Sequence, residues 1–113
     1  MGRPVVHFEI GCRDGSAAER FYSELFDWTI TAAGTSRTIA TGSDRGIQGH
    51  VSSLGHEPHD YVMFYVEVDD IPETLARATA LGGSKLVGPI PIPTGQFAWM
   101  KDPEGNLIGL LSR

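Results

Sequence analysis

The clearest pattern along the chain is an alternation of apolar and polar positions, which has the period of a β-strand. Residues 5–11, VVHFEIG, put a phenylalanine and an isoleucine on one face of such a strand, and His7 and Glu9 on the other. The alternation recurs over residues 61–68, YVMFYVEV, where every second residue is valine or phenylalanine. A sheet that helices cover on one side shows this pattern, so we expect the face that carries His7 and Glu9 to be open.

Two other segments have the spacing of amphipathic helices. Residues 16–26, SAAERFYSELF, place apolar side chains at intervals of four, which form one face of a helix. The second helix is predicted to begin after Asp70, a good N-cap, with Glu73 three residues later as the partner of a capping box. Gly82 and Gly83 indicate where this helix ends.

The same order of elements occurs in both halves of the chain. After a strand and a helix, each half continues with three short strands, at 27–33, 35–40 and 46–53 in the first half and at 84–92, 96–101 and 107–111 in the second. We therefore predict one α+β domain over residues 1–113, built from two βαβββ modules at about 1–55 and about 60–113. Two helices on one side of eight strands leave the other side open, and its mixed aromatic and polar residues are typical of a ligand cavity.

Composition and charge narrow the classes of partner. A chain of 113 residues with 41% hydrophobic content can bury one core, and no apolar run approaches the ~18 residues of a membrane span. The formal net charge is −5 and basic residues do not cluster, which argues against a nucleic-acid partner. The N-terminal residues lack a signal-peptide pattern, so we expect a cytoplasmic protein without membrane contact. Cys12 is the only cysteine, which excludes an internal disulfide and a cysteine-based zinc site.

Three segments carry a resemblance to a known superfamily: VHFEI followed by AERFYSELFDWTI, FYVEVDDIPETLARATALGG, and FAWMKDPEGNLIGLL. Together they resemble the vicinal oxygen chelate superfamily, which includes glyoxalase I, extradiol dioxygenases and bleomycin-resistance proteins. The chain is most similar to a branch of short, glyoxalase-related bacterial proteins. The resemblance implies paired βαβββ modules whose curved mixed sheets form a cavity, with the helices on the outer face, within a homodimer. It leaves open whether the modules pair within one chain or across two.

Metal-dependent members of this superfamily hold one divalent ion with side chains from four strands. By resemblance, His7 stands at the first ligand position and Gln48 or His50 near the second. The third position maps to Met63, where a histidine would be expected, and a thioether is a poor ligand for a hard divalent ion. The fourth maps to Gly109, where a glutamate would be expected, and glycine has no side-chain donor. No cofactor is therefore favoured, although a divalent metal held by His7 and His50 remains an alternative.

The glycine at position 109 lies inside an otherwise apolar strand, which suggests a close approach by another group. If residues 103–105 form a three-residue hairpin loop with a left-handed glycine, Trp99 lies opposite Gly109. Cross-strand neighbours share a face of the sheet, so we expect Gly109 to make room for the indole of Trp99 above the cavity. On this hypothesis an aromatic surface replaces the acidic ligand.

Candidate site residues follow from these patterns. Glu9 and Glu67 are weak candidates for general acid–base work, with a solvated rim or a salt bridge as the simpler interpretation. The ligand-binding candidates are His7, Gln48, His50, Met63, Tyr65, Trp99 and Gly109.

Three functions are compatible with this sequence. The leading hypothesis is a protein of the glyoxalase and bleomycin-resistance type that binds a small organic, partly aromatic ligand without the standard metal. The first alternative is a divalent-metal-dependent lyase or dioxygenase that uses His7 with His50 or Gln48. The second is a non-enzymatic interaction module whose open sheet face is a protein–protein interface.

Overall fold

A computed structural model describes residues 2–34, 36–53 and 60–113. The chain divides into two compact units. The N-terminal unit comprises His7–Val62, and the C-terminal unit comprises Met63–Arg113 together with the first residues of the chain up to Val6. Residues 54–59, at the boundary between the two predicted modules, lie outside the described residues.

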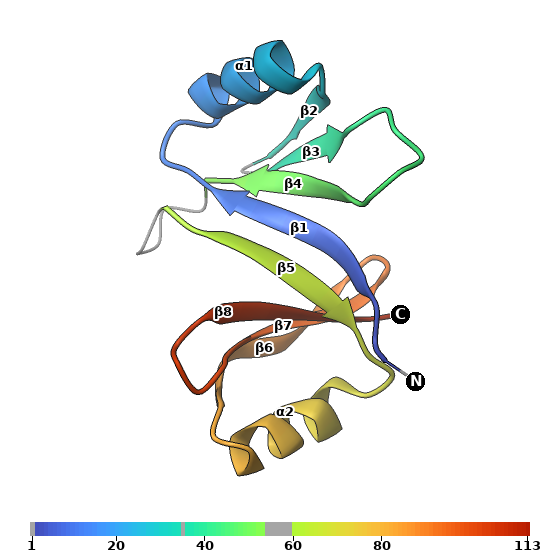
Figure 1. Cartoon of the computed structure of the whole chain (residues 1–113), viewed down its shortest axis with the longest axis vertical. Helices are drawn as coiled ribbons and strands as arrows, with labels where there is room; N and C mark the ends of the chain where they lie inside the picture. Colours follow the sequence, from blue (N-terminus) through green and yellow to red (C-terminus); the bar gives the residue numbers. More distant parts are fainter. Residues whose placement is uncertain (1, 35, 54–59) are drawn as a thin grey trace. The chain divides into compact units, whose positions relative to one another are not determined.

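The N-terminal unit contains one helix and a four-stranded sheet (Figure 1). Its elements are β1 (Val5–Gly11), α1 (Gly15–Phe26), β2 (Thr29–Ala33), β3 (Ser36–Ala40) and β4 (Gln48–Ser52). The strand order is β2-β3-β4-β1, with β4 antiparallel to β3 and parallel to β1. Helix α1 packs against β2, β3 and β4 and so covers one face of this sheet.

The C-terminal unit repeats this arrangement (Figure 1). Its elements are β5 (Val62–Glu67), α2 (Ile71–Ala80), β6 (Ser84–Ile92), β7 (Gly95–Lys101) and β8 (Leu107–Ser112). The strand order is β5-β8-β7-β6, with β8 parallel to β5 and antiparallel to β7. The predicted α+β fold of two βαβββ modules is therefore confirmed.

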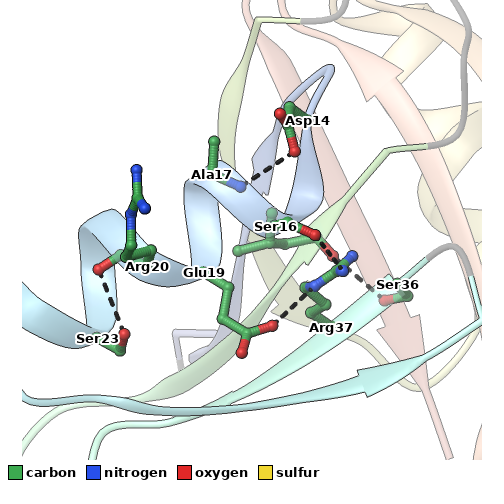
Figure 2. Close-up of polar contacts among 9 residues, drawn as sticks. Asp14, Ser16, Ala17, Glu19, Arg20, Ser23, Ser36 and Arg37 are labelled. Atoms are coloured by element: carbon green, nitrogen blue, oxygen red, sulfur yellow. Dashed lines mark hydrogen bonds and ion pairs between the residues drawn. The ribbon is translucent and has the colours of Figure 1, made fainter.

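Local sequence signals explain how both helices begin. The carboxylate of Asp70 accepts a hydrogen bond from the backbone N–H of Glu73 at 3.0 Å, as the predicted N-cap requires. Asp14 caps α1 in the same way through the N–H of Ala17, at 3.1 Å (Figure 2). From β3, Arg37 reaches α1 and donates to the carboxylate of Glu19 at 3.0 Å, which ties the helix to its sheet (Figure 2).

The two faces of residues 61–68 alternate as predicted, but the expectation that the valine and phenylalanine face is the covered one fails in the first half of the strand. Val62 and Phe64 are exposed, at 75% and 41%, whereas Met63 and Tyr65 are buried. The larger apolar area and the polar tip of a tyrosine favour its burial where a hydrogen-bond partner is at hand, as described below. The core of the C-terminal unit is formed by side chains from α2, from the two strands under it and from the chain leading into the helix, namely Val68, Ile71, Leu75, Ala98 and Leu110.

The described part of the chain contains no helix that is both long enough and apolar enough to cross a membrane.

Candidate functional site

Four polar side chains of the N-terminal unit form a continuous hydrogen-bonded network, which we call the histidine–glutamate network. Parallel pairing of β1 with β4 sets Glu9 beside His50. The Nε2 atom of His50 lies 3.2 Å from a carboxylate oxygen of Glu9, and its Nδ1 atom lies 2.7 Å from Nε2 of His7. The hydroxyl of Tyr61 donates a hydrogen bond to the second carboxylate oxygen of Glu9. The network thus runs from Tyr61 through Glu9 and His50 to His7.

When both imidazoles are neutral, the order of these contacts assigns their tautomers. The carboxylate of Glu9 accepts a hydrogen bond from the Nε2–H group of His50. The Nδ1 atom of His50 is then an acceptor, and the Nε2–H group of His7 donates to it. The unprotonated nitrogen of His7 is then Nδ1. A carboxylate that orients one imidazole, which in turn orients a second, is an arrangement able to hold and pass protons.

Glu9 is the most buried side chain of the network. Glu9 is 1% exposed, which corrects the expectation that its side chain faces an open surface. Burial of so polar a group is tolerated because both carboxylate oxygens have hydrogen-bonding partners. Burial, and then the hydrogen bond to Glu9, raise the pKa of the Tyr61 phenol above its ordinary value, so Tyr61 stays a donor.

His7 is only partly buried, yet its protonation is strongly disfavoured. Burial, and next the charge of His50, lower the pKa of His7 from 6.5 to about 4, although Glu9 acts in the opposite direction. His7 is therefore neutral at physiological pH. A neutral imidazole accepts and donates hydrogen bonds but attracts no anion by charge.

The lowered pKa of His7 predicts how the free energy of unfolding depends on pH. Because His7 binds a proton less readily in the folded state, its contribution to the free energy of unfolding is constant above pH 6.5 and falls as the pH drops towards about 4. After allowance for its solvent exposure, we expect a loss of roughly 1–2 kcal/mol. Chemical denaturation of wild type and His7→Gln across this range measures it. A wild-type curve with the same slope as that of the variant would contradict the assignment.

Gln48 does not join the network, although it pairs with His7 in the β1–β4 register. Its side-chain oxygen accepts from the backbone N–H of Thr41 at 2.5 Å, and its amide nitrogen donates to the carbonyl of Ser43 at 3.4 Å. Gln48 thus holds the connection between β3 and β4. Tyr61, by contrast, was missed as a site residue. The signal that could have found it is its place on the same predicted face as Met63 and Tyr65.

The aromatic candidates form a second group, in the C-terminal unit. Trp99 pairs with Gly109 across the β7–β8 hairpin, as its turn predicts, and Gly105 adopts a positive φ of 90°. Tyr65 is the parallel neighbour of Gly109 on the other side, and its hydroxyl accepts from the indole N–H of Trp99 at 2.8 Å. Tyr65 and Trp99 are 4% and 8% exposed.

The group that takes up the room beside Gly109 is the ring of Tyr65. A Cβ atom at position 109 would lie 2.3 Å from Cδ2 of Tyr65 and 2.5 Å from Cε2, far inside van der Waals contact. The expectation that the glycine accommodates the Trp99 indole is corrected accordingly. The indole instead holds the phenol that occupies this space.

The remaining candidates have simpler environments. Met63 is a buried apolar side chain, 3% exposed. Glu67 forms an ion pair with Arg113, with 2.5 Å between the guanidinium Nε and the carboxylate oxygen. This pair agrees with the salt-bridge interpretation of Glu67 more closely than with a general acid or base.

The residues present do not fit the standard divalent-metal site. His7 and Glu9 contact opposite nitrogens of the His50 ring, so these three donors lie in a row instead of converging on one point. Met63 and Gly109 supply no hard donor. Within residues 2–34, 36–53 and 60–113, no three histidine, cysteine, aspartate or glutamate side chains are grouped so that they could hold a metal ion.

Comparison with known proteins identifies the relatives of this chain. The family model described as a glyoxalase-like domain matches residues 6–111. A glyoxylase-like domain-containing protein from Didymella fabae is 31% identical over 122 residues, covering 96% of this chain and 93% of that protein. The protein CFP32 of Mycobacterium bovis is 31% identical over 81 residues, which cover 71% of this chain but only 31% of CFP32.

Solved structures agree with this relationship at the level of the fold. The Mn(II)-bound glyoxalase from Novosphingobium aromaticivorans aligns with a TM-score of 0.70 at 16% sequence identity, covering 99% of this chain and 40% of that one. At this identity the likeness shows a shared fold, and the metal belongs to the Novosphingobium protein.

Proposed function

Because this chain belongs to the glyoxalase-like domain family, we propose that it binds a small organic, partly aromatic molecule without the divalent ion of the metal-dependent members. The observation that carries the proposal is the contact between Gly109 and Tyr65. The position that the resemblance assigns to a metal-binding glutamate has no side chain, and the ring of Tyr65 fills the adjoining space. A carboxylate cannot be accommodated there unless that ring moves.

Two groups of side chains support binding of an organic molecule. The Tyr65–Trp99 pair is aromatic with a polar edge, and the histidine–glutamate network combines two imidazole rings with a buried carboxylate. Ligand sites in proteins are commonly built from apolar and aromatic side chains with a few oriented polar groups. A homodimer in the cytoplasm, with no nucleic-acid partner, stays a prediction.

A metal assay tests the proposal. Protein purified without an affinity tag or chelator is expected to contain far less than one equivalent of nickel, manganese, iron or zinc by mass spectrometry. Adding each of these ions, with iron as iron(II), should leave the melting temperature unchanged in wild type and in His7→Ala. A stoichiometric metal, or stabilisation that His7→Ala abolishes, would favour the metal-dependent lyase or dioxygenase instead.

A ligand screen addresses the second half of the proposal. In a Trp28→Phe background the only indole is that of Trp99, so its fluorescence reports on the aromatic group. Small aromatic compounds are expected to change this emission, and Trp99→Ala should weaken their binding by at least tenfold when it is measured by calorimetry. A screen in which no compound binds would favour the interaction module.

A further inference from the structure

A cavity of about 470 Å³ lies in the C-terminal unit, beside the helix α2. Its walls come from three segments that are far apart in the sequence: α2, the end of β7 with the turn that follows it, and the first residues of the chain. All three belong to the same compact unit. The lining residues are distinct from the histidine–glutamate network and from Tyr65 and Trp99. The volume is within the range of protein pockets that hold small molecules.

Three of the nine basic residues of the chain line this cavity. Arg3 forms an ion pair with Asp69, with 3.0 Å between the two charged groups. The other two are Arg77 on α2 and Lys101 at the end of β7. Within the described part of the chain, neither of these two side chains forms an ion pair. The fold therefore gathers positive charge at one place in a chain whose formal net charge is −5.

Two acidic residues also line the cavity, and the carboxylate of one of them is already occupied. Asp102 accepts hydrogen bonds at 2.9 Å from the backbone N–H groups of Glu104 and Asn106 and from the side-chain amide of Asn106. The other acidic residue is Glu73, which lies one turn before Arg77 on α2. The two cations without an ion pair thus outnumber the one carboxylate that is left to meet them.

The rest of the lining is largely apolar. Val68 is 7% exposed and belongs to the core of the unit, and Met100 packs against that core. Leu81, at the end of α2, is a large apolar side chain that is nevertheless 71% exposed. An apolar group that covers Leu81 and Met100 removes hydrocarbon surface from water, which is favourable. The cavity therefore combines an apolar surface with positive charge.

We propose that this cavity binds a small organic acid whose carboxylate pairs with Arg77 and Lys101. The hydrocarbon body of the acid then lies against Leu81 and Met100. A guanidinium group binds a carboxylate through two parallel hydrogen bonds, and an ammonium group adds a further charge-assisted one. An inorganic anion would leave the apolar lining uncovered, and a neutral apolar molecule would leave the cations unpaired. The proposal uses none of the residues assigned to the proposed function and does not depend on it.

The exposure of the charged groups sets the expected strength of binding. Arg77 and Lys101 are exposed, so water and dissolved salt screen their charges. A small ligand also makes few contacts, which limits the affinity that it can reach. We therefore expect a dissociation constant in the millimolar range, and weaker binding as sodium chloride is added.

A titration with octanoate, followed through the amide signals in ¹H–¹⁵N NMR spectra, tests the proposal. Octanoate is expected to cause saturable shifts in α2 and in residues 100–103. Octanamide has a similar chain without the charge, and acetate has the charge without the chain, so each should bind at least about fivefold more weakly. Octanoate shifts that do not saturate in the millimolar range, or that gather around Tyr65 and Trp99 instead, would overturn the proposal.

Matched variants identify the residues that bind the acid. Arg77→Gln and Lys101→Gln should each weaken octanoate binding at least about threefold. Arg20→Gln and Arg45→Gln remove the same charge from exposed positions of the N-terminal unit and should leave octanoate binding unchanged. Leu81→Ser should weaken it without changing the circular dichroism spectrum. Octanoate binding that is the same in wild type, Arg77→Gln and Lys101→Gln would show that these cations do not hold the carboxylate.

Discussion

Replacing Gly109 with glutamate should destabilise the protein by about 3 kcal/mol, at the upper end for overpacking of a filled interior. The first atom of any side chain at this position would lie 2.3 Å from the ring of Tyr65, and the strand and the ring cannot both stay where they are. Tyr65 is also fixed by its hydrogen bond to Trp99, so moving the ring breaks a second interaction. Urea denaturation followed by circular dichroism measures the change in the free energy of unfolding.

The cause of this effect can be separated from a general intolerance of substitution. In a Tyr65→Ala background the same change at Gly109 should alter stability by less than about 1 kcal/mol, because the two sites are coupled through their contact. Gly2→Ala is a matched control, since a Cβ atom there meets nothing within 4 Å. If Gly109→Glu leaves wild-type stability unchanged, the site can accept the family's carboxylate and the metal-free proposal loses its main support.

Glu9→Ala is expected to reduce the free energy of unfolding by roughly 3 kcal/mol, as for other buried, hydrogen-bonded charged groups. The substitution removes the acceptor of both the Tyr61 hydroxyl and Nε2 of His50, and it leaves a cavity where a 1% exposed side chain was packed. Denaturation at pH 7 measures the loss, and the ¹⁵N chemical shifts of His50 should show a changed tautomer population.

A double-mutant cycle with Tyr61→Phe isolates the hydrogen bond. Tyr61→Phe should destabilise wild type by about 1 kcal/mol and the Glu9→Ala variant by much less, because the bond is already gone. Glu9→Gln keeps the size of the side chain and is expected to be milder than Glu9→Ala. Additive effects of the two substitutions would show that the Tyr61–Glu9 contact contributes nothing.

Much of the fold could be predicted because the relevant signals are local. The signals for the strand over residues 5–11, the N-cap at Asp70 and the tight turn at residues 103–105 each act within a few positions, and all three elements are present as expected. The turn also determined the register of its hairpin, so the pairing of Trp99 with Gly109 was correct. A hairpin register follows from the loop that connects its strands.

Other predictions failed where two distant segments meet. The sequence does not say which neighbour of Gly109 occupies the space beside it, because Trp99 lies on one side and Tyr65 on the other. Likewise Val62 and Phe64 are apolar, as core residues usually are, but both are exposed. Alternation identifies the two faces of a strand, and the packing of the remaining chain decides which is buried.

The sequence by itself determined the two βαβββ modules, the N-cap at Asp70 and the absence of a carboxylate at position 109. Only the tertiary structure brought Tyr61, Glu9, His50 and His7 into one network and placed the ring of Tyr65 against Gly109. The physical reason is that β1 with β4, and β5 with β8, are parallel pairs. Their register is set by long connections and by core packing, because no tight turn can join parallel strands.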